Sequence, residues 1–214
     1  EDFPAARHAF EACFHISGDR RFLRDLVRVA EEEGDVELAV GWQVKHHAET
    51  VLDPATTAEE RHQAALWLAD LLRRAGRMGE AIQCLEDTLA RAEQGALADL
   101  VERELARLHA EAGDPARAIE LFQHVLPIHA AAADIADWRT LIRMHRDVMG
   151  DGATAYALQW KLVRAQPTSQ RDLDDLVDLA FDLDEVADCA AQLEALAGEH
   201  EGEAHICLLG RAAV

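Results

Sequence analysis

Residues 112–122, AGDPARAIELF, decide the fold of this 214-residue chain. The Gly-Asp-Pro sequence at the start of this stretch predicts a turn that ends the preceding helix. Asp114 is a favoured helix N-cap, and Pro115 suits the first helical position, where its missing N–H costs nothing. Ala118 and Phe122 are four residues apart and therefore share one face of the second helix. The stretch thus predicts a helix, a tight turn and another helix.

The same pattern recurs along the chain, as EGDVELAV (33–40), AGRMGEAI (75–82) and MGDGATAY (149–156). The glycines that open the four copies are 42, 37 and 37 residues apart. A weaker copy, FDLDEVADCA (181–190), supplies Asp182 in place of a glycine. Apolar residues spaced three and four apart precede each turn and predict amphipathic helices. Such a helix pair cannot bury its apolar stripe alone, so we expect successive pairs to stack.

This arrangement resembles the tetratricopeptide repeat (TPR) family, whose unit is a helix A, a tight turn and a helix B of about 34 residues together. The resemblance rests on the Gly-Asp turns and on small and bulky residues after them, namely Ala39, Ala81, Ala118, Ala155, Leu85 and Phe122. Gln43 and Gln159 stand where the family has bulky residues. The resemblance implies an all-α solenoid of about five helix-turn-helix repeats in a right-handed superhelix, with divergent repeats.

We predict a single solenoid over residues 1–214. Its expected parts are a half repeat (1–18), five repeats (19–54, 55–95, 96–130, 134–167 and 168–204) and the start of a further helix (205–214). The chain begins with Glu1, so we expect it to be part of a longer, bacterial-type chain.

Composition limits the partners. The formal net charge of −20 repels nucleic-acid phosphates. No apolar run approaches the roughly 20 residues needed to span a bilayer. The four cysteines are far apart and predict buried thiols in a reducing compartment, which favours the cytoplasm.

Catalytic and metal-binding patterns are missing from the sequence. Ser17 and Ser169, the two serines, do not lie in a Gly-x-Ser-x-Gly elbow, and the chain has no phosphate-binding glycine loop and no His-Glu-x-x-His pair. The candidate metal pairs are Cys13 with His15, His46 with His47, and His205 with Cys207. Residues one or two apart point in different directions on a helix, so none of these pairs can chelate an ion. The sequence predicts a non-enzyme without cofactor or metal.

Arginines flank the apolar stripe of several A helices and are the candidate binding residues. They are Arg21, Arg24, Arg28, Arg73, Arg74, Arg103, Arg107, Arg139, Arg143 and Arg146. In TPR proteins this flank of helix A lines a concave groove that takes extended peptides or a partner's C-terminal carboxylate. The resemblance therefore implies an acidic or extended peptide bound to arginines. The alternative is a solvated helix face, on which arginines pair with acids such as Glu104 at helical spacing.

Residues 168–204 carry twelve acidic residues and one basic residue, Arg171. This segment predicts either a polar capping repeat or a docking face. A docking face would take a basic partner or the arginine groove of a second copy, which would self-associate the chain. For the whole chain we predict a non-catalytic protein–protein interaction scaffold or adaptor. The alternatives are a regulatory or sensor module that controls an attached domain and, third, an enzyme with a helical-solenoid active site.

Overall fold

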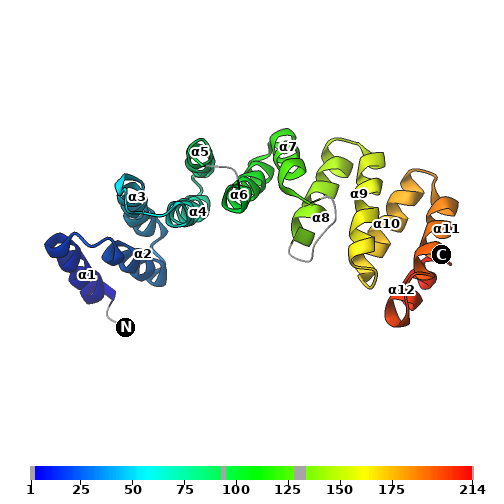
Figure 1. The fold of residues 1–214 in the computed structure, drawn as a ribbon, viewed down its shortest axis with the longest axis horizontal. Coiled ribbons are helices and arrows are strands. Elements are labelled where there is room, and N and C mark those ends of the chain that lie inside the picture. The colour runs from blue at the N-terminus through cyan, green and yellow to red at the C-terminus, as the bar shows by residue number, and fades with distance from the viewer. Residues whose placement is uncertain (1–2, 93–94, 128–133, 214) are drawn as a thin grey trace. The chain divides into compact units, whose positions relative to one another are not determined.

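The computed structural model describes residues 3–92, 95–127 and 134–213. In these ranges the chain forms twelve α-helices, one short π-helical turn and no strand, which confirms the all-α fold class (Figure 1). The elements are α1 (Phe3–Ser17), α2 (Arg21–Glu33), α3 (Val36–Leu52), α4 (Ala58–Arg74), α5 (Met78–Leu89), α6 (Ala96–Ala112), α7 (Pro115–Val125), α8 (Ile135–Arg143), η2 (Met144–Val148), α9 (Gly152–Ala165), α10 (Gln170–Asp182), α11 (Val186–Ala197) and α12 (Gly202–Ala212).

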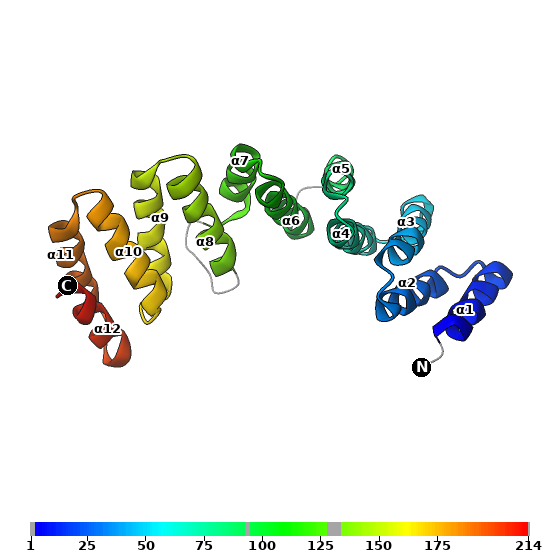
Figure 2. The same cartoon turned by 180° about the vertical axis from the view of Figure 1, so that it is seen from behind.

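The helices belong to two compact units, Glu1–Leu121 and Phe122–Val214. In the first unit each helix from α1 to α6 packs on the next one along the chain, and the same holds from α8 to α12 in the second. Figures 1 and 2 show α9, α10 and α11 side by side from both directions. Packing between sequence neighbours is the signature of stacked helical hairpins. The predicted boundary between the third and fourth repeats falls on residues 128–133, outside the described ranges.

The turns inside the hairpins follow the sequence prediction. Gly113 has φ +81°, and the N–H of the next residue, Asp114, donates to the carbonyl of His109 at 2.9 Å. This bond satisfies one of the last carbonyls of the helix, and only glycine adopts its backbone conformation without strain. The Asp114 carboxylate then accepts from the N–H of Arg117 at 3.2 Å, which caps the next helix.

The last hairpin makes its turn without glycine. Asp184, with φ +60°, occupies the left-handed position, and the N–H of Glu185 donates to the carbonyl of Ala180 at 2.8 Å. The sequence pattern placed this turn at Asp182, two residues too early, because no glycine marks it. Aspartate tolerates the left-handed region better than most residues.

One A helix contains an extra residue. In four hairpins the turn bond runs from an N–H to the carbonyl five residues earlier, at Ala30, Leu72, His109 and Ala180. In the remaining hairpin the N–H of Asp151 donates to the carbonyl of His145, six residues earlier, at 2.8 Å. The π-helical turn η2, Met144–Val148, contains this additional residue. The A helices are α2, α4, α6, α8 with η2, and α10. Because each of them carries one of these five turn carbonyls in its last turn, equivalent positions are counted back from the carbonyl residue.

Small residues and their partners four positions later fill the hairpin cores. Leu85 and Phe122, each four residues after the small residue of its helix B, are fully buried. Gln43 and Gln159 hold the same position and are equally buried. Their amides donate to backbone carbonyls of the next A helix, from Gln43 Nε2 to Ala64 O at 2.9 Å and from Gln159 Nε2 to Asp172 O at 2.6 Å. A buried amide needs such a partner, so these glutamines replace packing by a hydrogen bond between hairpins.

Candidate functional site

The predicted arginines occupy repeated positions of the A helices. Counted back from the turn carbonyls at Ala30, His109 and His145, the sixth residue is Arg24, Arg103 and Arg139. The second residue before the same carbonyls is Arg28, Arg107 and Arg143. Three A helices therefore carry arginine pairs at identical places. In α10, whose turn carbonyl is Ala180, these places hold Asp174 and Asp178 instead.

The first hollow, which we call the α2–α4 hollow, lies in the first unit and has a volume of about 720 Å³. Of the predicted residues, Arg21 and Arg24 line it. The Asp19 carboxylate holds Arg21, with Nη2 at 2.7 Å from Oδ2. Arg24 is exposed and forms no ion pair with any residue that the structure describes. It is therefore the guanidinium in this hollow that remains available to a ligand.

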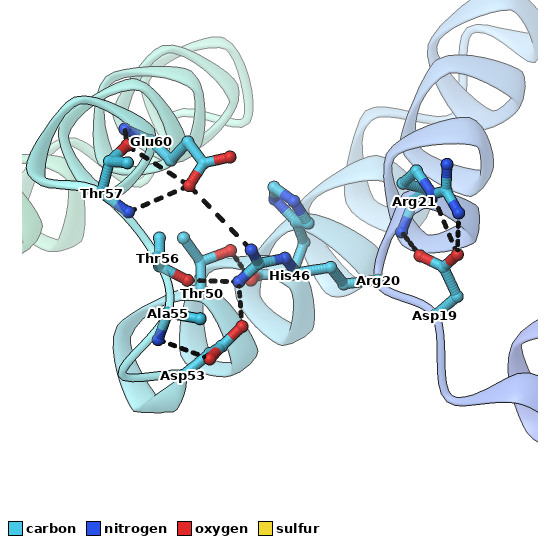
Figure 3. A network of polar contacts seen from close by, with 10 residues as sticks. All are labelled: Asp19, Arg20, Arg21, His46, Thr50, Asp53, Ala55, Thr56, Thr57 and Glu60. Atoms are coloured by element: carbon cyan, nitrogen blue, oxygen red, sulfur yellow. Dashed lines mark hydrogen bonds and ion pairs between the residues drawn. The ribbon is translucent and has the colours of Figure 1, made fainter.

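Arg20, which is not among the predicted binding residues, fixes the wall of this hollow. Figure 3 shows its side chain reaching from the start of α2 to the loop between α3 and α4. Its Nη1 lies 2.9 Å from Asp53 Oδ2 and also donates to the Thr56 hydroxyl. Its Nη2 is 4.0 Å from Glu60, which belongs to the capping box at the start of α4. Arg20 thereby joins two hairpins.

His46 lies at the side of the α2–α4 hollow and is 7 % exposed. Burial and then the positive charges of Arg24, Arg20 and His47 lower its pKa to about 4. Its Nδ1 is buried without a hydrogen-bond partner in the described part of the chain, and its ring meets Trp67 edge-on at 6.4 Å. The imidazole is neutral at pH 7, so arginines alone supply positive charge there.

The second hollow, the α8–α10 hollow, lies in the second unit and has a volume of about 410 Å³. Arg139, Arg143 and Arg146 all line it, and Arg171 of α10 joins them. Arg143 is exposed and forms no ion pair among the described residues. Arg146 Nε is 3.0 Å from its exposed neighbour Asp147, and Arg171 is 3.9 Å from Asp175. This hollow brings four guanidinium groups together.

Arg139 differs from the other arginines because it binds a fully buried carboxylate. Its Nε and Nη2 donate to the two oxygens of Asp172 at 2.9 and 2.8 Å, and Asp172 is 0 % exposed. Burial by itself raises the pKa of Asp172, but hydrogen bonds from Arg139 and Ser169 bring that pKa below its ordinary value. The pair connects α8 to α10, so Arg139 holds these two helices together and also lines the hollow.

The other five predicted arginines line neither hollow: Arg28, Arg73, Arg74, Arg103 and Arg107. Arg74 Nη1 is 2.6 Å from Glu31, and Arg107 Nη1 is 3.0 Å from Glu104. Arg73 Nη2 is 2.7 Å from Asp70. These are the surface ion pairs that the alternative interpretation of the arginines expects, and each contributes little to stability.

The acidic C-terminal segment is mostly solvent-exposed. Ten of its twelve carboxylates are exposed; the exceptions are the buried Asp172 and the half-buried Asp175. Burial raises the pKa of Asp175, while Arg171 lowers it. Asp174 Oδ1 is 2.5 Å from Arg211 of α12.

In the described ranges no group of three or more metal-ligating side chains comes together. No helix there combines the length and apolar character needed to cross a membrane.

Residues 60–131 match the family model described as tetratricopeptide repeat. No curated protein sequence matches the chain. The kinesin light chain TPR-like repeats of Podosopora anserina have 19 % identity, with 90 % of this chain and 92 % of that chain covered and a TM-score of 0.60.

Two further solved structures have the same fold. BtubC from P. vanneervenii is 16 % identical over 99 % of this chain and 87 % of its own, with a TM-score of 0.60. A tetratricopeptide repeat protein from Parabacteroides merdae is 14 % identical over 99 % of this chain and 79 % of its own, also with a TM-score of 0.60. At such identities these likenesses concern the fold alone.

Proposed function

We propose that this chain, a tetratricopeptide-repeat protein with divergent repeats, is a non-catalytic scaffold or adaptor that binds an acidic, extended peptide segment. The TPR fold generally serves protein–protein interaction and is typically non-catalytic. The observation that carries the proposal is the arginine pair at identical positions of α2, α6 and α8. A single surface pair needs no explanation, but the same pair on three A helices suits an acidic ligand that each of these helices can contact.

The chemistry of the two hollows supports an acidic ligand. A guanidinium donates two parallel hydrogen bonds to a carboxylate and keeps its charge when partly buried. Arg24 in the α2–α4 hollow and Arg143 in the α8–α10 hollow are exposed and have no ion-pair partner among the described residues. Each can therefore receive a carboxylate without first losing an internal partner.

The test uses the double variant Arg143→Glu, Arg146→Glu of the whole chain. Arg139 stays unchanged, because its replacement would leave Asp172 buried and unpaired. The probe is a fluorescein-labelled oligoglutamate peptide, and binding is followed by fluorescence anisotropy at low salt. We expect at least about tenfold weaker binding, since two charge-assisted contacts become repulsive. Circular dichroism should remain that of the wild type.

The matched control is Arg164→Glu, an exposed arginine of α9 outside both hollows. It changes the net charge in the same direction and should reduce the affinity only slightly. The variant Arg24→Glu tests the α2–α4 hollow in the same way. If the hollow variants and Arg164→Glu lose affinity equally, or if labelled oligolysine binds as tightly as oligoglutamate, the proposal is wrong.

A further inference from the structure

A third hollow lies in the first unit, on a different face of α3 and α4 from the α2–α4 hollow. Its volume is about 640 Å³, and we call it the α4–α6 hollow. The ends of α3 and α5 and the starts of α4 and α6 surround it. His46 of α3 lines the α2–α4 hollow, whereas the next residue, His47, lines this one. The proposed peptide-binding arginines have no part in it.

The charged and titratable side chains in the described lining are all basic: Arg61, Arg91, His47 and His62. Neither arginine forms an ion pair with a described residue. Burial, followed by the charge of Arg91, lowers the pKa of His47. In a protein with a formal charge of −20, a hollow whose described lining holds two arginines and no acidic residue is an exception. Such a concentration of one sign favours a bound anion.

His62 adds a buried group that lacks a partner. Its residue is 7 % exposed, and its Nδ1 lies 2.5 Å from the carbonyl of Ala58. The ring therefore donates through Nδ1, and Nε2 is left buried with no hydrogen-bond partner among the described residues. An unsatisfied buried ring nitrogen is costly, and in this tautomer Nε2 is a hydrogen-bond acceptor. A phosphate oxygen pairs with it through one proton, held either as imidazolium N–H or as phosphate O–H.

The start of α6 supplies a second kind of anion contact. Gly95, the N-cap, has no side chain to cap the helix, and Gly95, Ala96 and Leu97 all line the hollow. The first turn of this 17-residue helix therefore borders the hollow, which places the positive end of the helix dipole beside it. Val51, Ala92 and Leu97 provide apolar wall. The volume is that of a small-molecule site.

We propose that the α4–α6 hollow binds a small organic phosphate, with its phosphate on Arg61, Arg91, His62 and the start of α6 and its organic part on the apolar wall. A phosphate monoester carries close to two negative charges at pH 7 and matches two guanidinium groups. A monocarboxylate of the same shape would leave one guanidinium without a partner. Occupancy of such a site would make the chain a sensor of that metabolite in addition to its proposed binding of peptides.

The experiment is calorimetric titration of the whole chain with phenyl phosphate, inorganic phosphate and benzoate. Phenyl phosphate has both the dianion and an apolar body, and each of the other probes lacks one of them. We expect phenyl phosphate to bind at least about tenfold more tightly than either. Arg61→Gln and Arg91→Gln should each weaken it about tenfold, because each removes a charge-assisted hydrogen bond.

Arg164→Gln is the matched control: it removes the same charge from an exposed position in the second unit and should leave phenyl phosphate affinity unchanged. Equal binding of phenyl phosphate and benzoate would refute the phosphate assignment. Equal binding of phenyl phosphate and inorganic phosphate would refute the organic part. Wild-type affinity in Arg61→Gln and Arg91→Gln would refute the site. The variant Arg143→Glu, Arg146→Glu should bind phenyl phosphate normally, so this inference and the peptide-binding proposal fail independently.

Discussion

At the residue scale, Arg139–Asp172 is the ion pair with the most deeply buried carboxylate among the described residues. Asp172 is fully buried, so Arg139→Gln leaves a buried carboxylate with weakened compensation. We expect this variant to lose about 2–3 kcal/mol in the free energy of unfolding at pH 7, less than a wholly buried pair because Arg139 is partly exposed. Urea denaturation measures the loss. Arg171→Gln, which removes an exposed 3.9 Å pair, should cost under about 0.5 kcal/mol.

The same pair gives a pH dependence with a definite sign. Because the folded state lowers the pKa of Asp172, the stability gained from its charge is present above the unfolded pKa of aspartate and is lost as the pH falls through the lowered value. The difference between wild type and Arg139→Gln should therefore shrink in acid. A difference that stays constant down to the acid transition would show that Asp172 is not the group involved.

His46 gives a prediction at higher pH. Its folded pKa of about 4 lies below its ordinary value of 6.5, so between these values the unfolded chain takes up a proton that the folded chain does not. This contribution to stability is present above pH 6.5 and is lost as the pH falls towards 4. His46→Leu should therefore lose less stability than wild type between pH 7 and pH 5. An NMR titration of the ring with a midpoint near 6.5 would contradict the prediction.

At the scale of the element, the glycine turn of the AGDPARAIELF stretch sets the end of α6. Gly113 has φ +81°, so Gly113→Ala should lower the free energy of unfolding by about 1 kcal/mol through backbone strain alone, as an added Cβ meets no other atom. Gly41 is the control, since it lies inside α3 with ordinary helical geometry and open space around it. Gly41→Ala should raise stability by about 0.5–1 kcal/mol. Thermal unfolding followed by circular dichroism checks both signs.

Sequence reasoning could predict most of the elements because helix, turn and helix are local properties. The spacing of apolar residues, the Asp caps and the glycines lie within a few residues of one another, and Pro127 follows the end of α7 as a helix breaker should. The position of the turn at Asp184 could not be predicted, because no glycine marks its left-handed residue. The extra residue in η2 could not be predicted either, because Gly76, Gly113 and Gly150 are equally spaced although only the last of them follows a π-helical turn.

The candidate site could be predicted only in part, for a different reason. The four-residue spacing within each arginine pair is local and could be read from the sequence. The register of Arg139 and Arg143 relative to the other pairs could not, because it depends on the extra residue in η2. The partners of those arginines are not local, as Asp172 is 33 residues from Arg139 and Glu31 is 43 residues from Arg74. Nothing in the sequence distinguishes Arg143, which has no ion pair among the described residues, from Arg139, which holds a buried acid. The basic α4–α6 hollow could not be predicted from the sequence, because its lining residues come from four separate helices.

At the scale of the whole molecule, each unit is built from helices that pack on near neighbours along the described chain, so damage should remain local. Leu208 of α12 is fully buried and packs in the core that Leu173, Leu176 and Leu193 help to form. Leu208→Ala should cost about 2–4 kcal/mol locally. Hydrogen exchange should quicken in α10–α12 and stay unchanged in α1–α5. Leu105→Ala, at a buried site of α6, should give the reverse pattern. Faster exchange everywhere in either variant would show that the array unfolds as one body.

The extra residue in η2 means that repeat length and packing register can change separately. His109 and His145 are both buried before their turns, and Asp114 and Asp151 lie near their rings at 3.4 and 3.6 Å, although one hairpin is a residue longer. A chain of this kind can gain or lose single residues at the ends of its helices during evolution while every core position is preserved. Alignments of such proteins should therefore be anchored on buried positions, because glycine spacing alone would assign Arg139 and Arg143 to the wrong columns.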